Sequence, residues 1–496
     1  MHPDPKTAMA SFVRQRTITP AGTVLSGTSL FLLLTVSSAL HAQSALQDGR
    51  VIPFPRDSLG RTQAPDRRER SHLVTALEIV GFIATLNVFD RLALGSDYRS
   101  DLSSIRRNLR RSWVVEDDPY LINQFGHPYQ GATYFGIARS AGLGYWTSSA
   151  YTFASSALWE IAGETTAPSR NDQIASGISG AFLGEPLYRI AQLILENGGD
   201  PPSSGRERSA GVAAPPVGFN RAVFGRRFDA VLPSRGAEYY RRLQFGVASA
   251  IRNSAGTSRG VSPNEALAEA SIEYGLPGPD EYRYSRPFDY FTLQATASSA
   301  NGFESIVTRG LLTGRAYRLG SAYRGLWGLY GSYDFIAPQL FRVSSTALSL
   351  GTTAQWWLSP GVALQGSVLG GAGYAAVGTN RGPRDGDYQY GIAPQALVAL
   401  RLIAGDHAAL DVTGREYYVS DVGASTAGAR DHIARAEATF TVRLYRQNAI
   451  ALKYVWSRRD ATYPDIGDRD QLRGTLGLFY SFLGSDRFGA TDWRNR

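Results

Sequence analysis

The stretch that decides the fold is AEATFTVRL, residues 436–444, in which apolar and polar residues alternate. Ala436, Phe440 and Leu444 share one face with the other even-numbered residues, and the polar odd-numbered residues share the opposite face. A period of two places successive side chains on opposite sides of a β-strand. The segment therefore predicts a strand with one apolar and one polar face.

The same alternation continues through the C-terminal half of the chain. About twelve segments show it, near residues 239–252, 264–275, 287–300, 303–317, 321–335, 340–358, 361–377, 387–404, 407–419, 431–445, 448–459 and 470–484. Most of these segments have 11 or more residues. They are longer than strands typical of soluble proteins and long enough to cross a bilayer at a tilt.

The connections between the later segments alternate in length. Tight turns are predicted at 358–361, 404–407 and 445–448, and long polar loops at 377–388, 419–431 and 458–470. Short turns on one side and long loops on the other are typical of transmembrane barrels. We therefore predict an α+β chain by segments, with a small N-terminal helical bundle followed by an antiparallel transmembrane β-barrel of about 12 strands. A soluble secreted β-domain is the alternative.

The last strand carries a further indication of an outer-membrane protein. TLGLFYSF, residues 475–482, resembles the C-terminal signal by which bacterial outer-membrane proteins are recognised for barrel insertion. The resemblance lies in a polar residue, a glycine two positions later, and then a hydrophobic and a final aromatic residue. It implies the barrel-assembly machinery as a partner during insertion and outer-membrane lipid as the surroundings. Fourteen residues, 483–496, follow the signal.

The N-terminus predicts export from the cytoplasm. Residues 1–42 contain Arg14 and Arg16, an apolar run, and small residues up to Ala42, which is the pattern of a cleaved signal peptide. Cleavage near Ala42 and localisation in the outer membrane of a Gram-negative envelope are expected. Residues 43–71 are rich in Arg, Asp and Pro and are interpreted as a flexible tether.

The composition excludes several kinds of chemistry. The chain has no cysteine and six histidines, so disulfides, thiolate metal sites and a Cys nucleophile are excluded and a His-rich zinc centre is disfavoured. Lys+Arg number 51 against 43 Asp+Glu, and the net charge of +8 comes from an excess of arginine that is not by itself evidence of nucleic-acid binding. We therefore expect no nucleic-acid partner.

The polar faces of the strands predict a lumen with charges of both signs. Its candidate residues are Arg242, Gln244, Glu269, Glu273, Thr292, Gln294, Thr296, Gln355, Asp411, Arg415, Glu437, Arg443, Lys453 and Arg473. An ion-selective pore would more often concentrate one sign at a constriction. Mutual neutralisation inside a narrow barrel is the favoured interpretation, and a selective pore is the alternative.

Residues 72–196 are predicted to form the helical domain, with helices near 72–94, 130–164 and 169–195 and a break near 142–147. The Pro, Gly and Ser-rich residues 197–238 are interpreted as a linker and lead-in to the barrel at 239–484, which a tail at 485–496 follows. We expect the domain to lie in the periplasm or to plug the lumen, and packing against the barrel is a further alternative.

Several polar residues of this block stand on otherwise apolar helices. Glu160 and Glu164 are one turn apart and share a face, so they need an arginine, a proton or a cation if they are buried. Arg139 and Arg189 are candidate partners. No cofactor is predicted, and a divalent cation at Glu160 and Glu164 is an alternative.

Structural rather than catalytic roles are favoured for the other polar residues. Ser169, three residues before Asp172, is predicted to be a helix N-cap rather than a nucleophile. Glu185 and Arg189 are four residues apart and predict an intrahelical ion pair. His127 is expected to be a hydrogen-bonded loop histidine rather than a general base.

These residues carry a resemblance to a bacterial family, domain of unknown function 3943. NQFGHPYQG, SSALWEIAGE, PSRNDQIASG and GAFLGEPLYR, between Asn123 and Arg189, are similar to its ordered motifs, and GFNR at 218–221 extends the resemblance. The family positions are His127, Tyr129, Arg139, Trp159, Glu160, Glu164, Ser169, Asn171, Asp172, Glu185 and Arg189. The resemblance implies no activity. A looser similarity to VanZ-like membrane proteins is an analogy only.

Two hypotheses about function follow. The first is a non-catalytic outer-membrane barrel, structural, pore-related or partner-binding, whose helical domain plugs the lumen or binds a periplasmic partner. The second is an envelope hydrolase or lipid-modifying enzyme that uses His127, Glu160, Glu164 and Asp172 on lipid or cell-wall material. The first is favoured. Convergence of these side chains on an open cavity would favour the second.

Overall fold

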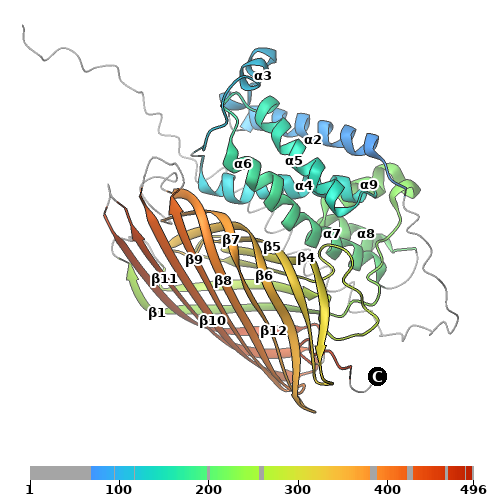
Figure 1. Ribbon diagram of the computed structural model, residues 1–496, viewed down its shortest axis with the longest axis vertical. Helices are drawn as coiled ribbons and strands as arrows, with labels where there is room; N and C mark the ends of the chain where they lie inside the picture. The colour runs from blue at the N-terminus through green and yellow to red at the C-terminus, as the bar shows by residue number, and fades with distance from the viewer. Residues whose placement is uncertain are drawn as a thin grey trace, which may run out of the picture.

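The structure is a computed structural model that combines helices and a barrel. It describes residues 69–493 except 94, 117, 198–200, 256–261, 380–387, 422–427, 464–466 and 486. The predicted signal peptide and nearly all of the predicted tether lie outside these residues. Figure 1 shows the helices gathered beside a tilted barrel.

The N-terminal half is helical. Its α-helices are α2 (His72–Ala93), α3 (Leu102–Asn108), α4 (His127–Ser140), α5 (Tyr145–Ala162), α6 (Arg170–Ile174), α7 (Gly180–Glu196), α8 (Ser204–Ala213) and α9 (Pro215–Phe224). Its short segments are η1 (Ser96–Tyr98), η2 (Ile122–Gly126), η3 (Ala175–Ser179) and η4 (Gly225–Phe228). The predicted break between two helices falls at 141–144, where Gly142 has a φ of 86°.

The C-terminal half forms twelve antiparallel strands, as the alternation predicted. They are β1 (Tyr239–Ala255), β2 (Asn264–Tyr274), β3 (Phe291–Ser298), β4 (Ser305–Leu319), β5 (Tyr323–Ile336), β6 (Phe341–Ser359), β7 (Val362–Thr379), β8 (Tyr388–Ala404), β9 (Ala408–Asp421), β10 (Arg430–Tyr445), β11 (Asn448–Thr462) and β12 (Arg469–Leu483). Each strand pairs with its neighbours in sequence, and β1 pairs with β12. The sheet therefore has no open edge.

The two faces of the barrel wall differ as the strand AEATFTVRL predicted. Phe440, Val442 and Leu444 of β10 are exposed on the outside. Glu437 of the same strand points inward, where its carboxylate lies 2.8 Å from Lys453 Nζ. An apolar outer wall around a polar interior suits a barrel that is surrounded by lipid. The barrel is therefore a transmembrane barrel of the outer membrane.

The interior is crossed by ion pairs rather than lined by one sign of charge. Lys453 on β11 contacts Glu269 on β2 at 2.6 Å, although β12 and β1 lie between these strands. Arg401 contacts Glu273 at 3.1 Å and Asp411 at 2.6 Å. The pairs of Lys453 with Glu269 and of Arg401 with Glu273 cross the lumen, and all of these pairs neutralise both signs, in agreement with the favoured interpretation of its charges.

One rim of the barrel has mostly short connections, apart from the longer one between β2 and β3, and is also partly closed by the C-terminal tail. Connections 320–322, 360–361, 405–407 and 446–447 lie at this rim with the start of β1 and the end of β12. In outer-membrane barrels the short turns are periplasmic. The side chain of Gln355 on β6 donates to Thr491 O at 2.6 Å, and that of Gln365 on β7 donates to Gly489 O at 2.7 Å. The tail therefore folds back into the barrel mouth.

The helical domain packs against the outer wall of the barrel. Tyr333 on β5 points outward, next to the inward Asp334, and donates to Gln124 O at 2.6 Å. Phe182 of α7 meets Gly331, which also faces outward on β5. One apolar cluster joins α4, α5 and α7 to strands β2–β5, β7 and β8. The predicted alternative of packing against the barrel is therefore confirmed and lumen plugging is wrong, because large aromatic residues on this part of the wall provide an apolar surface for the helices.

Residues 201–238 are also more ordered than a linker. They contain α8 and α9, and Ala210, Ala214 and Val217 pack with residues of α7 in one buried cluster. Ser203 caps α8 and proline begins α9. The Pro and Ser residues that suggested a linker therefore mark helix starts, where both are common.

Candidate functional site

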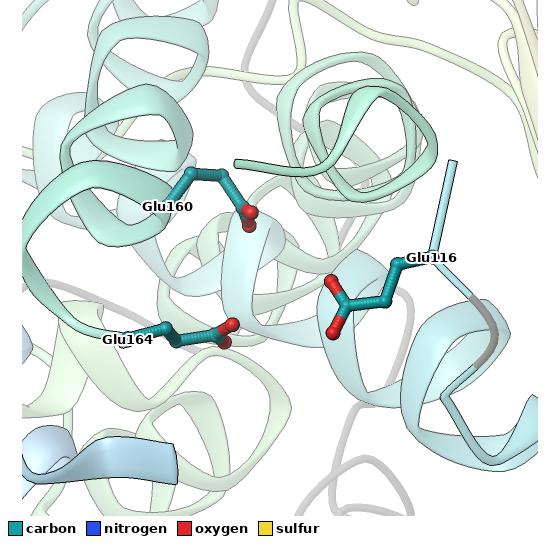
Figure 2. A group of neighbouring side chains, drawn as sticks. All are labelled: Glu116, Glu160 and Glu164. Atoms are coloured by element: carbon teal, nitrogen blue, oxygen red, sulfur yellow. The ribbon is translucent and has the colours of Figure 1, made fainter. Parts of the chain in front are cut away.

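Three carboxylates converge at the end of the helical bundle that lies near the long-loop rim. Glu160 comes from α5, Glu164 follows that helix, and Glu116 comes from the segment before η2. One carboxylate oxygen of each lies within 4.8 Å of the others. Figure 2 shows the three side chains pointing toward one another. We call these residues the Glu cluster.

The Glu cluster is held by neutral donors. Ser169 N donates to Glu160 Oε2 at 2.8 Å, and Trp159 Nε1 donates to Glu164 Oε1 at 2.7 Å. Thr166 Oγ1 donates to Glu164 Oε2 at 3.0 Å. Glu160 is 1% exposed, and its Oε1 atom has no hydrogen-bond partner. This atom is therefore a buried acceptor that points into the cluster and is unsatisfied.

In the described part of the chain, no arginine or lysine pairs with the Glu cluster. Among the residues that the structure describes, no ion pair involves Glu116, Glu160 or Glu164. Burial, followed by the charges of Asp118, Asp172 and Glu164, raises the pKa of Glu116 from 4.5 to about 9. Burial also raises the pKa of Glu164, although His127 opposes that shift. The cluster therefore favours a proton or a bound cation.

His127 lies beside the Glu cluster, at the start of α4. Its Nδ1 lies 3.1 Å from Ser176 Oγ, and its Nε2 lies 3.9 Å from Asp172 Oδ1. His127 is 5% exposed, and Ser176 and Asp172 are also buried. The histidine is hydrogen-bonded as expected, but it belongs to a helix rather than a loop.

Asn171 connects this region to the barrel wall. Its side-chain amide donates to Tyr390 Oη at 2.8 Å, and its Oδ1 accepts from Glu116 N at 2.9 Å. Ser169 caps α6 by accepting from Asp172 N, which confirms the predicted N-cap. The family positions near the Glu cluster thus position the backbone of Glu116 and join it to β8.

A second polar network lies at the other end of the bundle, near the short-turn rim. Arg139 Nε donates to Glu185 Oε2 at 2.7 Å, and Arg189 Nε donates to Glu185 Oε1 at 2.8 Å. The predicted intrahelical pair of Glu185 and Arg189 is confirmed. The candidate pairing of Arg139 or Arg189 with Glu160 or Glu164 is wrong, because Glu185 binds both arginines.

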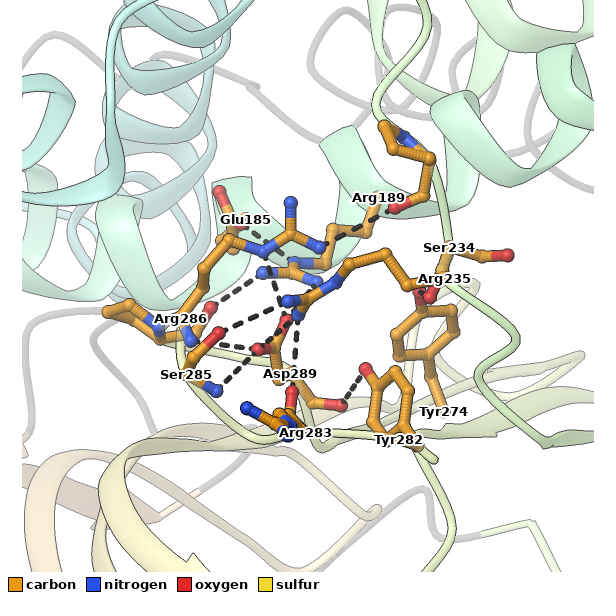
Figure 3. A network of polar contacts seen from close by, with 12 residues as sticks. Glu185, Arg189, Ser234, Arg235, Tyr274, Tyr282, Arg283, Ser285, Arg286 and Asp289 are labelled. Atoms are coloured by element: carbon orange, nitrogen blue, oxygen red, sulfur yellow. Dashed lines mark hydrogen bonds and ion pairs between the residues drawn. The ribbon is translucent and has the colours of Figure 1, made fainter. Parts of the chain in front are cut away.

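This second network reaches the barrel through Asp289, in the connection between β2 and β3. Asp289 is buried and contacts Arg189 at 3.1 Å and Arg235 at 2.6 Å. It also accepts from the backbone N–H of Arg286 at 2.8 Å. Figure 3 shows these side chains around the carboxylate. Burial raises the pKa of Asp289, but Arg189, Arg286 and Arg235 together lower it below its ordinary value.

The structure therefore divides the predicted site residues between two ends of the bundle. His127, Trp159, Glu160, Glu164, Ser169, Asn171 and Asp172 lie around the Glu cluster, whereas Arg139, Glu185 and Arg189 form the other network. Tyr129 is partly buried on α4. The sequence interpretation missed Glu116, Asp118 and Asp289. Each lies outside a regular helix or strand, where no periodic pattern marks it.

The fold and this site define a class of protein, an outer-membrane β-barrel joined to a helical domain on its outer wall. Residues 112–217 match the family model of a domain of unknown function, DUF3943. The match covers about a fifth of the chain. It begins before Asn123 and so includes Glu116 and Asp118, and it ends before GFNR at 218–221. No match is found among curated proteins.

Solved structures with similar folds are outer-membrane barrels. An outer-membrane channel from Pseudomonas putida F1 is 10% identical, with a TM-score of 0.26, and the match covers 51% of this chain and 97% of that one. The channel DcaP of Acinetobacter baumannii is 9% identical, with a TM-score of 0.22 and coverages of 50% and 96%. The translocator domain of the Neisseria meningitidis autotransporter NalP is 16% identical, with a TM-score of 0.21 and coverages of 49% and 88%.

Proposed function

We propose that this outer-membrane barrel anchors a helical domain that binds a divalent cation at the Glu cluster. The observation that carries the proposal is the convergence of Glu116, Glu160 and Glu164 within 4.8 Å. Burying ionised carboxylates without a partner is unfavourable, so the ionised cluster needs a positive charge. A cation supplies that charge in a place where the ion pairs of the described residues supply none.

The chemistry of the donors favours a hard cation. Three carboxylates offer only oxygen ligands, which suit Mg²⁺, Ca²⁺ or Mn²⁺ better than a soft metal. The unsatisfied Oε1 of Glu160 is an available ligand atom. A cation there would tie α5 to the segment that carries Glu116, and thereby stabilise the end of the bundle next to Tyr390. The cation would therefore have a structural role.

The barrel serves as an anchor rather than an open channel in this proposal. The bridge between Lys453 and Glu269 crosses the lumen, and Thr491 of the tail contacts Gln355 at the mouth. Both features obstruct the path that a solute would follow. Insertion through the barrel-assembly machinery, using the aromatic end of β12, belongs to the same proposal.

Cation binding is tested by calorimetric titration of the purified protein in detergent with Mg²⁺, Ca²⁺ and Mn²⁺ separately. We expect saturable binding of at least one ion, and binding at least about tenfold weaker in Glu160→Gln and Glu164→Gln. Glu207→Gln is the matched control, because Glu207 lies in the same domain but pairs with Arg221 on the surface. Equal binding by all three variants, or no binding by the wild type, contradicts the proposal.

An envelope enzyme is the second candidate, and the arrangement of His127 favours it. The imidazole lies between Ser176 Oγ and Asp172 Oδ1, as in sites that activate a hydroxyl group. If the protein is such an enzyme, we expect His127→Gln to abolish turnover of a lipid or cell-wall substrate and Glu207→Gln to leave it unchanged. If His127→Gln, Glu160→Gln and Glu164→Gln lower only stability, while the barrel still resists SDS unless heated, the structural role stands.

A further inference from the structure

The outward face of α2 is apolar along its whole length. Leu77, Val88, Phe89 and Leu92 are 55 to 84% exposed. The exposed positions of α2 include no Asp, Glu, Lys or Arg. A helix on the surface of a soluble domain normally shows polar residues to water. The outward face of α2 is therefore as apolar as a buried face, although the described residues do not cover it.

The inward face of α2 carries its buried polar side chains. Thr75, Asn87 and Asp90 are buried there beside Ile79 and Ile83, and Asn87 Nδ2 donates to Gly163 O at 2.6 Å. The outward face is thus more apolar than the inward face. This distribution is the reverse of that in a water-soluble helix, and it suits a helix whose outer surroundings are hydrocarbon.

Neighbouring helices continue the same surface. Trp146 and Phe153 of α5 are 62% and 48% exposed. Phe219 and Val223 of α9 are each 56% exposed. The exposed apolar area therefore extends over three helices, which exceeds what scattered surface residues explain.

Helix α2 extends in the direction from one rim of the barrel to the other. α2 starts beside the end of α4, where Ser71 N donates to Ala141 O, and ends beside the end of α5, where Asn87 contacts Gly163. The first of these ends lies toward the short-turn rim and the second toward the long-loop rim. The 22 residues of α2 span about 33 Å at 1.5 Å per residue, close to the roughly 30 Å of a hydrocarbon core.

Charged residues gather beyond the end of α2. Arg106 and Arg107 of α3, and Arg110 and Arg111 just after it, are exposed. They follow the end of α2 near the long-loop rim, and Figure 1 shows α3 projecting from that end of the bundle. A basic segment at the end of an apolar span suits the level of lipid headgroups, whose phosphates attract arginine.

The lipid-facing wall of the barrel is continuous with the bundle. On β6, Thr346 meets Ser179 of the helical domain, while Leu348 and Leu350 on the same face of the strand are 48% and 56% exposed. Lipid that covers Leu348 and Leu350 therefore reaches the edge of the helices. Of the helices that the structure describes, α2 alone is long and apolar enough to cross a membrane.

We propose that the helical domain is embedded in the outer membrane beside the barrel, with the outward face of α2 in contact with lipid acyl chains. The occupant of this face is hydrocarbon rather than water or a second protein. This inference does not depend on cation binding, because it rests on α2, α5 and α9 and not on the Glu cluster.

Single cysteines test this placement directly, since the chain has none. Ala84→Cys and Phe89→Cys on α2 are labelled with an environment-sensitive fluorophore, and the proteins are reconstituted in vesicles of brominated phosphatidylcholine. Leu350→Cys on the barrel wall is the lipid-facing control, and Ser103→Cys on α3, exposed beyond the apolar span of α2, is the control outside the hydrocarbon that iodide can reach. Heat-modifiable migration confirms that each variant has a folded barrel, and Ala84→Cys provides a mild change if Phe89→Cys does not fold.

We expect brominated lipid to quench the α2 labels as strongly as the label at Leu350→Cys, and at least about threefold more than the label at Ser103→Cys. Iodide in the aqueous phase should quench only the label at Ser103→Cys. Strong iodide quenching at Ala84→Cys would place α2 in water and overturn the inference. Protection from both quenchers would show a protein covering the face, and would overturn it as well.

Discussion

Glu116 gives the helical domain a defined dependence on pH. Its pKa rises from 4.5 to about 9 on folding. Because the folded state keeps this proton that the unfolded chain loses, stability falls as pH increases from about 4.5 to about 9. We expect the midpoint of thermal unfolding of cation-free protein to fall over this interval, and Glu116→Gln to weaken the dependence. An unchanged slope in Glu116→Gln would show that another group dominates.

A cation should reverse this trend. Ligand carboxylates must lose their protons before they bind a metal, so affinity increases with pH. We expect Ca²⁺ or Mg²⁺, whichever binds in the titration, to raise the unfolding midpoint more at high pH than at low pH. The Glu207→Gln variant should show the same cation-dependent rise in the unfolding midpoint as the wild type at each pH.

Gly131 lies where α4 and η3 approach each other closely. A Cβ atom at this position would lie 1.9 Å from Ser176 O, and the facing Gly180 is similarly constrained. Gly131→Ala should therefore separate α4 from η3 and destabilise the domain by about 1–3 kcal/mol. Gly144→Ala is the control, because nothing lies within 4 Å of its new Cβ. Equal thermal unfolding of the two variants, followed by the far-UV helical signal, would contradict this packing.

At the scale of single residues, the sequence predicts some contacts of the site and not others. Glu160 and Glu164 are one turn apart, so helical periodicity places them together. Glu116 joins them through an isolated parallel bridge between Val114 and Ser169, in which Val114 N donates to Pro168 O. A single bridge between distant segments leaves no periodic pattern, and for this reason Glu116 could not be predicted.

Among the elements, the connection between β2 and β3 holds the helical domain to the barrel. Asp289→Asn would leave Arg189 and Arg235 without a buried counter-charge, and loss of such a partner costs about 3–5 kcal/mol. We expect faster tryptic cleavage near residues 225–238, with the barrel still resistant to SDS. Asp280→Asn on the same connection is the control, since its pair with Arg324 is exposed. Equal cleavage of both variants would show that apolar packing alone holds the domain.

The strands were predictable and α8 and α9 were not, for a physical reason. Alternation along a strand such as β10 arises from the different environments of its two faces, and the sequence records it directly. α8 has only ten residues and few large apolar side chains. Ala210 and the following cap residue Ala214 make its packing contacts, and both are small residues that resemble those of a linker.

At the scale of the whole molecule, the C-terminal tail obstructs the path of ions through the barrel. Removal of residues 485–496 takes away the contacts of Thr491 with Gln355 and of Gly489 with Gln365. We expect the truncated protein to show several-fold higher ion conductance in planar bilayers than the full chain, because the mouth at the short-turn rim is widened. Heat-modifiable migration checks that the barrel forms. Unchanged conductance would mean that the ion pairs across the lumen are the main obstruction.

The position of the helical domain could not be predicted from the sequence. An aromatic side chain that faces lipid and one that faces a helix obey the same alternation, so Tyr333 and Phe335 on β5 do not differ in pattern from exposed residues elsewhere. The distinction arises only when the helices and the wall are seen together.

The attachment of the helices to the outer wall also sets an order of events in time. The helices precede the barrel in the chain, yet the surface that receives them exists only after β2–β8 have formed. Their apolar faces must therefore be kept from aggregating while the strands are delivered and inserted. Docking of the helical domain becomes the last step of assembly, although its residues are the first to be exported.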